Sequence, residues 1–169
     1  IGPLAVLSDT PAVIGAPVGA IPPAVGWVAA GGEAGSPALL VLMAFLFLWQ
    51  VPHFWLLLLA RAEDYERAGL PLLTGIFSPP RVRRITFTWT MAMAAACVAF
   101  PVFGIARQPW AFALLLALTG HQAWRATVLL KADADAAGTL MTAFNRLNLY
   151  TLLVLLLVAL DQGAVMWRI

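Results

Sequence analysis

Charged side chains are scarce in this sequence. Asp, Glu, Lys and Arg make up only 11% of its 169 residues, whereas 62% of the residues are hydrophobic. Soluble domains carry about 25% charged residues, so a chain this apolar would aggregate in water. The net charge of +2 is also too small to indicate nucleic-acid binding. The composition therefore predicts a protein embedded in a lipid bilayer, with no nucleic acid among its partners.

Cysteine and targeting signals are nearly absent as well. The single cysteine, Cys97, excludes an intramolecular disulfide. The first residues lack the basic region and the short isolated apolar core of a secretory signal peptide. The chain begins at Ile1 rather than at Met, which we interpret as a fragment or a processed product.

What the chain does have is a series of long apolar runs. A helix needs about 20 apolar residues to cross the hydrocarbon core of a membrane. The runs that meet this length are 11–30, 37–60, 85–106, 110–130 and 147–167. They predict an all-α fold, a polytopic transmembrane helical bundle of about five spans, with residues 1–169 as a single transmembrane domain. Residues 61–84 and 131–143 are expected to be loops.

Proline and glycine are concentrated in the first of these runs. It contains Pro11, Gly15, Pro17, Gly19, Pro22, Pro23 and Gly26. A proline inside a helix removes a hydrogen bond and clashes with the preceding turn. We therefore expect a broken or kinked span, with a re-entrant loop as the alternative. The run 85–106 is expected to kink near Pro101 for the same reason.

Basic residues gather in two of the predicted loops. Five arginines lie in residues 61–84, and the region 125–146 adds Arg125, Lys131 and Arg146, whereas the turns at 31–36 and 104–109 contain only Arg107. Loops rich in Lys and Arg stay on the cytoplasmic side of a membrane. Both basic regions are therefore predicted to face the cytoplasm.

Polar side chains interrupt the strongest run at Gln50 and His53. Three residues apart on a helix, they lie on neighbouring faces of one turn. Polar residues within a span usually face the protein interior and mark a site. The alternative is interfacial anchoring, because Trp49, Phe54 and Trp55 resemble the aromatic belt found at membrane surfaces.

Two adjacent carboxylates, Glu63 and Asp64, follow this run, flanked by Arg61 and Arg67. Mg²⁺ prefers one or two carboxylates together with water and substrate phosphates, and arginine complements phosphate oxygens. The set therefore suits a metal-bound diphosphate. The alternative is an ordinary solvated loop in which Glu63 and Arg67 form a pair four residues apart.

Three sequence motifs resemble one family. Residues 49–55 read Trp-Gln-Val-Pro-His-Phe-Trp, residues 61–71 read Arg-Ala-Glu-Asp-Tyr-Glu-Arg-Ala-Gly-Leu-Pro, and residues 14–27 read Ile-Gly-Ala-Pro-Val-Gly-Ala-Ile-Pro-Pro-Ala-Val-Gly-Trp. In content, order and separation they resemble the heme O synthases, the protoheme IX farnesyltransferase branch of the UbiA-type membrane prenyltransferases. The resemblance is sharp over residues 14–73 and vague beyond them.

The resemblance implies an all-helical membrane fold, usually of nine spans, in the inner (plasma) membrane of a bacterium. It implies that farnesyl diphosphate binds through Mg²⁺ held by two Asp-rich cytoplasmic loops, and that its allylic cation is attacked by a vinyl group of protoheme IX, so that heme b becomes heme O. By position, Asp64 and Glu63 would hold the metal and act in catalysis with Tyr65. Arg61 and Arg67 would bind the diphosphate, and Gln50 and His53 would line the substrate cavity.

The chain also departs from the family pattern. The first acidic motif, Asn-x-x-x-Asp-x-x-x-Asp, is absent, and about four N-terminal spans are missing, so the chain resembles the C-terminal portion of the enzyme. A missing N-terminal half, or the machinery that assembles terminal oxidases, would then be a partner besides the substrates and the lipid bilayer. The alternatives are a non-catalytic truncated fragment that binds lipid, heme or a partner, another UbiA-type prenyltransferase, and part of a transporter.

Other polar residues are expected to have structural or solvent roles. His121, Trp124 and Arg125 are interpreted as an interface cluster. Asp161 is expected to be solvated at the far end of the last helix. Asp133 and Asp135 are expected to be loop charges.

Overall fold

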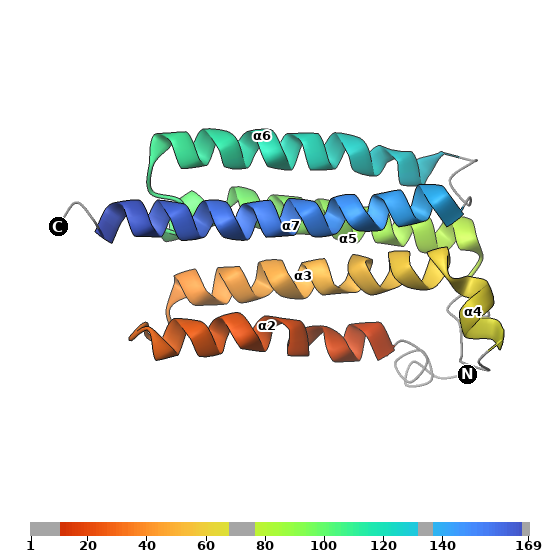
Figure 1. Ribbon diagram of the computed structural model, residues 1–169, viewed down its shortest axis with the longest axis horizontal. Coiled ribbons are helices and arrows are strands. Elements are labelled where there is room, and N and C mark those ends of the chain that lie inside the picture. The colour runs from red at the N-terminus through yellow and green to blue at the C-terminus, as the bar shows by residue number, and fades with distance from the viewer. Residues whose placement is uncertain (1–10, 68–76, 132–136, 167–169) are drawn as a thin grey trace.

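The computed structural model describes residues 11–67, 77–131 and 137–166, and five long helices run side by side through it (Figure 1). These helices are α2 (Pro11–Ala29), α3 (Pro37–Ala60), α5 (Pro79–Val98), α6 (Pro109–Ala126) and α7 (Ala137–Met166). A short helix, α4 (Ala62–Arg67), follows α3, and two 3-10 segments, η2 (Phe100–Phe103) and η3 (Thr127–Leu130), follow α5 and α6. The predicted all-α helical bundle is confirmed.

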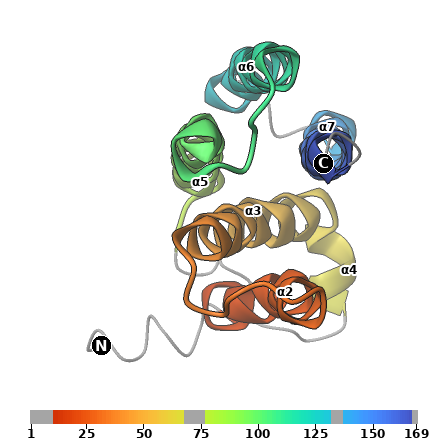
Figure 2. The same cartoon turned by 90° about the vertical axis from the view of Figure 1, so that its left-hand side faces the viewer.

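Helix α3 lies at the centre of the bundle (Figure 2). It contacts α2 on one side and α5 and α7 on the other, and α6 packs against α5 and α7. Side chains from all five long helices meet in one core. In it the rings of Phe45 and Phe100 pack edge to face, with centroids 5.3 Å apart. Because α3 touches three neighbours, its polar side chains point at other helices rather than at solvent.

The start of α3 is specified locally by its sequence. Ser36 is the N-cap, and its Oγ accepts a hydrogen bond from the Leu39 N–H at 3.4 Å. Pro37 occupies the first helical position, where no N–H is needed. The 24 residues of α3 extend about 36 Å. Within the described residues, α3 and the segment Ala137–Gly163 of α7 are long and apolar enough to cross a membrane.

Helix α2 is continuous from Pro11 to Ala29, so a break in the span and the alternative re-entrant loop were both wrong, whereas the expected kink stays a prediction. Each internal proline removes only one hydrogen bond from the ladder. Packing against α3 compensates for these losses, because Ala20 is buried in the common core and Gly19 lies against the Gln50 side chain.

Two boundaries of α5 differ from the sequence prediction. The helix begins at Pro79, inside the predicted loop, since Ser78 and the two prolines after it form a favourable first turn. It ends at Val98, and Pro101 lies in η2 rather than in a kinked helix. The segment then turns at Gly104, whose φ of 71° suits glycine.

Helix α7 begins ten residues before the predicted span. From Leu147 on, its buried residues recur every three or four positions, and Leu140 lies seven residues earlier. They are Leu140, Leu147, Tyr150, Thr151, Val154, Leu157 and Asp161. This spacing places them along one face of the helix, which packs against α3 and α6. The predicted loop 131–143 overlaps the first turns of α7, where Gly138, Thr139 and Thr142 are typical loop residues, and Asp133 and Asp135 lie outside the described residues.

Asp161 is buried, with a side chain 0% exposed, so the prediction that it is solvated was wrong. Its carboxylate accepts hydrogen bonds from the backbone N–H groups of Arg107 at 2.8 Å and Gln108 at 2.9 Å. Gln108 is the N-cap residue of α6. Asp161 therefore caps a helix more than fifty residues away in the chain, where a negative charge also favours the helix dipole.

The charged residues lie mostly at one end of the bundle. The end of α3, all of α4, the start of α5, the end of α6 and the start of α7 meet there (Figure 1). Eight of the ten basic residues of the chain belong to these segments or to the residues that directly follow α3 and η3, and Arg107 lies at the opposite end. The observed helix order thus agrees with the alternation from which the cytoplasmic side was predicted.

Cysteine labelling tests this orientation. Ser78→Cys, at the start of α5, should react with an impermeant thiol reagent only from the cytoplasmic side, because it lies among the basic residues. Glu33→Cys, in the turn between α2 and α3, should react only from the other side. The buried Cys97 provides the unreactive background. Labelling of Ser78→Cys in intact cells would contradict the orientation.

Candidate functional site

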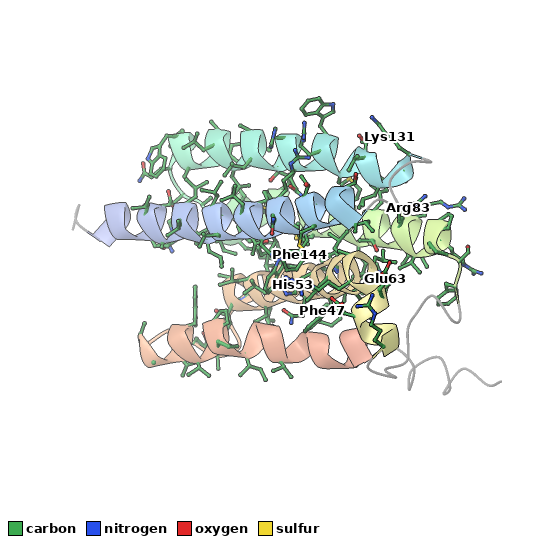
Figure 3. All side chains as sticks on the ribbon, turned by 45° about the vertical axis from the view of Figure 1, so that its right-hand side comes forward. Phe47, His53, Glu63, Arg83, Lys131 and Phe144 are labelled. Atoms are coloured by element: carbon green, nitrogen blue, oxygen red, sulfur yellow. The ribbon has the colours of Figure 1, made fainter. Side chains whose placement is uncertain are left out.

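His53 meets α7 through Asn148. The Nδ1 atom of His53 lies 2.7 Å from the Asn148 Oδ1 atom, and the Nε1–H of Trp49 donates to the same oxygen at 3.2 Å. His53 and Phe144 lie close together between α3 and α7 (Figure 3), with ring centroids 4.9 Å apart. The three polar groups thus connect two helices across 95 residues of chain.

These contacts define the tautomer of the neutral histidine, that is, which ring nitrogen carries the proton. An indole N–H can only donate, so the Asn148 atom that it reaches must be the amide oxygen. That oxygen can only accept, so Nδ1 of His53 must carry the proton. In the neutral imidazole the lone pair is then on Nε2, which is left available as a base or a ligand.

The surroundings of His53 are aromatic, and the alternative of interfacial anchoring stays a prediction. Its ring centroid lies 4.7 Å from that of Trp49 and 5.4 Å from that of Phe54. Trp55 is buried at 7% exposure, and Phe54 is exposed. His53 itself is half-buried at the contact of α3 and α7. Its predicted place in a substrate cavity stays a prediction.

Gln50 points to a different neighbour. A Cβ atom built on Gly19 would overlap the Gln50 amide, so this side chain lies directly against α2. Glycine at position 19 is therefore what allows α2 to pack so closely against Gln50. The structure brings Gln50 and His53 to the same turn of α3, but it turns them toward different helices.

The short helix α4 carries the predicted diphosphate residues. Arg67 pairs with Glu63 at 3.2 Å and with Asp64 at 3.9 Å, and Arg61 lies 4.0 Å from Asp64. All four side chains are exposed, by 57% to 85%. The expected pair of Glu63 and Arg67 is therefore present. The side chain of Tyr65 lies outside the described residues.

The carboxylates of α4 fit Mg²⁺ only as part of its coordination shell. No group of three or more His, Cys, Asp or Glu residues able to hold a metal occurs within residues 11–67, 77–131 and 137–166. Glu63 and Asp64 are adjacent and open to solvent, which suits an ion that takes most of its ligands from water and phosphate. Their arginine partners could then turn to the phosphate oxygens.

Substitution of Asn148 tests the link between α3 and α7. Asn148→Leu should lower the free energy of unfolding by about 1–3 kcal/mol, because it leaves the Trp49 and His53 N–H groups without their acceptor. Asn148→Asp keeps an acceptor oxygen, so its free energy of unfolding should fall less. Thermal unfolding in detergent measures both. Asn145→Leu, at an exposed position of α7, is the control. If it lowered the free energy of unfolding as much as Asn148→Leu, the hydrogen bonds of Asn148 would not stabilise the contact of α3 and α7.

Sequence reasoning missed Asn148. The only local signal was an amide within an apolar run, the same signal that singled out Gln50. The partner of that amide could not be predicted, because no spacing rule relates positions so far apart.

The chain was compared with known proteins. The model of the UbiA prenyltransferase family matches residues 5–152. A protoheme IX farnesyltransferase from Geobacter sulfurreducens is 43% identical over 62% of this chain and 40% of that protein. Protoheme IX farnesyltransferase 2 from Mesorhizobium japonicum is 36% identical over 85% of this chain and 44% of its own length.

A third relative, a protoheme IX farnesyltransferase from Polaromonas naphthalenivorans, is 36% identical over 86% of this chain and 47% of its own. The chain thus spans less than half the length of these relatives. No solved structure matches it. Because the family model covers most of its residues, the chain belongs to the UbiA prenyltransferase family.

Proposed function

We propose that the chain is part of an enzyme that transfers the farnesyl group of farnesyl diphosphate to a vinyl group of protoheme IX, which converts heme b to heme O. The observation that carries this proposal is the set of relatives named protoheme IX farnesyltransferase, which match up to 86% of the chain. We place the protein in the inner membrane of a bacterium, with α4 on the cytoplasmic side.

In this proposal α4 binds the diphosphate. Its carboxylates and arginines are exposed at the charged end of the bundle, where a water-soluble headgroup can arrive while its prenyl chain enters the apolar bundle. Arg61 and Arg67 would exchange their carboxylate partners for phosphate oxygens. Tyr65 belongs to the same turn of the chain and is proposed to act beside them.

Asp64 and Glu63 would hold Mg²⁺, which when bound neutralises the negative charge that develops on the leaving diphosphate. Departure of the diphosphate leaves an allylic cation, and the vinyl group of the heme attacks it. Water then completes the hydroxyethylfarnesyl group. Excluding bulk water from the cation until that step requires an apolar cavity, whose lining would include His53 and Gln50.

His53 is held by Asn148 in a single tautomer, with the lone pair on Nε2. A histidine whose other ring N–H is donated to a carbonyl oxygen is held in one tautomer and one orientation. His53 would therefore position the heme or accept a proton near the reacting vinyl group. Asn148 would act through His53 and is a positioning residue.

The second candidate function is a membrane fragment without turnover. It is favoured by the ion pairs within α4, since each described carboxylate there already has an arginine partner. A single acidic helix also does not provide the opposed carboxylates that a metal-bound diphosphate needs. The two candidates differ in whether heme O forms when the remaining helices are supplied.

The test therefore uses the chain in two forms. The purified 169-residue chain, given protoheme IX, farnesyl diphosphate and Mg²⁺, should form no heme O, because it has one acidic helix. The same chain joined to the N-terminal helices of the Geobacter relative should form heme O in a strain without its own enzyme. Heme extraction and mass analysis measure the product.

Each form can contradict the argument separately. Turnover by the chain alone would refute the need for a second acidic loop. A joined protein that is present in the membrane at normal abundance but forms no heme O would favour the fragment without turnover.

A further inference from the structure

A basic groove lies between α6 and α7 at the charged end of the bundle. Three adjoining hollows form it, and Arg146 of α7 lines all three. Arg125 of α6 lines the two inner ones, and Lys131 contributes to the middle one. The innermost hollow is narrow, with a volume of about 10 Å³, whereas the middle one has about 200 Å³. Its charged lining residues are all cations.

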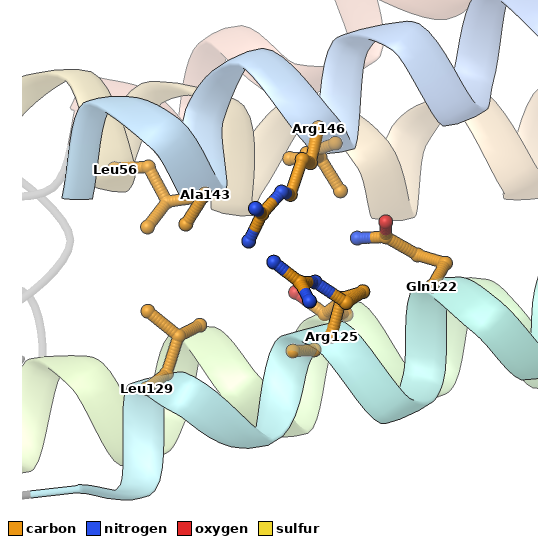
Figure 4. Close-up of a pocket in the computed structure, with 9 residues that line it drawn as sticks. Leu56, Gln122, Arg125, Leu129, Ala143 and Arg146 are labelled. Carbon is orange, nitrogen blue, oxygen red and sulfur yellow. The ribbon is translucent and has the colours of Figure 1, made fainter. Parts of the chain in front are cut away.

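The side chains are directed into this groove. The guanidinium groups of Arg125 and Arg146 face each other across it, and the Gln122 amide is turned toward the same gap (Figure 4). Within the described part of the chain, no carboxylate pairs with either arginine. The guanidinium carbon of Arg125 lies 5.4 Å from the centroid of the Trp124 ring. Two like charges that face each other beside apolar walls repel, and an anion between them would remove that repulsion.

Gln122 is the second, independent observation. Its side chain is 5% exposed, and it makes no hydrogen bond with any described residue. Buried amides normally find a partner, because an unmet donor or acceptor costs about 1–3 kcal/mol. The Gln122 amide opens onto the basic groove, where a ligand can supply the hydrogen-bond partner that the described residues do not.

The framework around the groove is fixed. Arg83 is buried at 4% exposure, and its guanidinium donates to the carbonyl oxygens of Leu129 and Lys131, both at 3.4 Å. These bonds hold η3 against α5. On the inner side, Leu56 and Leu147 line the groove. Leu56 follows His53 by one turn of α3, and Leu147 precedes Asn148.

We propose that this groove binds the two propionate carboxylates of protoheme IX; the inference rests on the proposed function. Two guanidinium forks match two carboxylates one to one, and the buried amide adds a hydrogen bond. Trp124 and Val128, which line the middle hollow beside the arginines, offer apolar contacts to the edge of a porphyrin ring. A metal-bound diphosphate fits less well, because the groove offers no described carboxylate for the metal, whereas α4 offers two.

The experiment compares protoheme IX with its dimethyl ester, which lacks the two charges. The 169-residue chain is placed in nanodiscs of phosphatidylcholine, empty nanodiscs serve as the blank, and Soret absorbance gives Kd. The chain should bind protoheme at least about tenfold more tightly than the ester, the scale of one charge-assisted hydrogen bond. Arg125→Gln with Arg146→Gln should abolish this preference and leave the affinity for the ester unchanged.

Further variants make the test specific. Gln122→Leu should reduce the preference several-fold. Arg81→Gln with Arg84→Gln removes the same charge from exposed positions at the same end of the bundle and should change nothing. Unchanged ester binding by each variant shows that the protein is folded.

Four results would overturn the inference. A preference for protoheme that survives in the double variant would show that the two arginines do not bind the propionates. Displacement of protoheme by inorganic pyrophosphate would assign the groove to diphosphate, and loss of protoheme binding in nanodiscs that contain phosphatidylglycerol would assign it to lipid headgroups. The fourth result is no binding of either porphyrin. The results with pyrophosphate and with phosphatidylglycerol do not concern heme O formation, so the proposed function would stand. Only the last, together with absence of heme O from the joined protein, would refute both.

Discussion

Asp64→Asn should lower heme O formation by about a hundredfold or more, the scale of losing one electrostatic stabiliser in a preorganised site. The substitution keeps the size of the side chain and removes its charge. Asp64 is exposed on α4 and lies within ion-pair distance of Arg61 and Arg67. Interactions that strengthen as charge develops on the leaving diphosphate act on the transition state, so kcat should fall more than substrate affinity.

Glu63→Gln is the matched comparison on the same helix. It should lower heme O formation less, since Glu63 is 85% exposed and pairs with Arg67 alone, whereas Asp64 lies near two arginines. Both variants are measured in the joined protein, with its abundance checked by immunoblot. If the carboxylates were ordinary solvated charges, each would contribute about 0–1 kcal/mol, and both variants would be nearly silent. Normal heme O with Asp64→Asn at normal abundance would remove Asp64 from the site.

Asp161→Ala should have the largest effect on stability. It leaves the backbone N–H groups of Arg107 and Gln108 without their acceptor. Each unsatisfied donor should lower the free energy of unfolding by about 1–3 kcal/mol. It also removes a negative charge from the start of α6. We expect Tm in detergent to fall by roughly 5–10 °C.

Asp161→Asn keeps one acceptor oxygen, so its Tm should lie between those of the wild type and the alanine variant. Glu33→Ala is the control, because it removes an exposed carboxylate at the same end of the bundle. Both proteins should retain the α-helical circular dichroism of the wild type before melting. A Tm for Asp161→Ala equal to that of Glu33→Ala would show that the cap contributes nothing.

The elements that sequence predicted best are those specified by neighbouring residues. Helix α3 spans the predicted residues 37–60, because its cap, its first proline and its apolar run are all local. The paired ions of α4 also follow from spacing, since residues three and four apart on a helix are neighbours. The start of α7 was missed, because glycine and threonine in its first turns are also typical of a loop.

The sequence by itself determined that the chain is a helical membrane protein of the UbiA family, and it located the charged end of the bundle. Only the tertiary structure decided which distant groups meet: Asp161 with the start of α6, His53 with Asn148, and Arg125 with Arg146. The reason is physical. Helix formation depends on residues within a turn or two, whereas these contacts depend on how separate helices rotate and pack, and their cost or gain appears only when both partners are buried together.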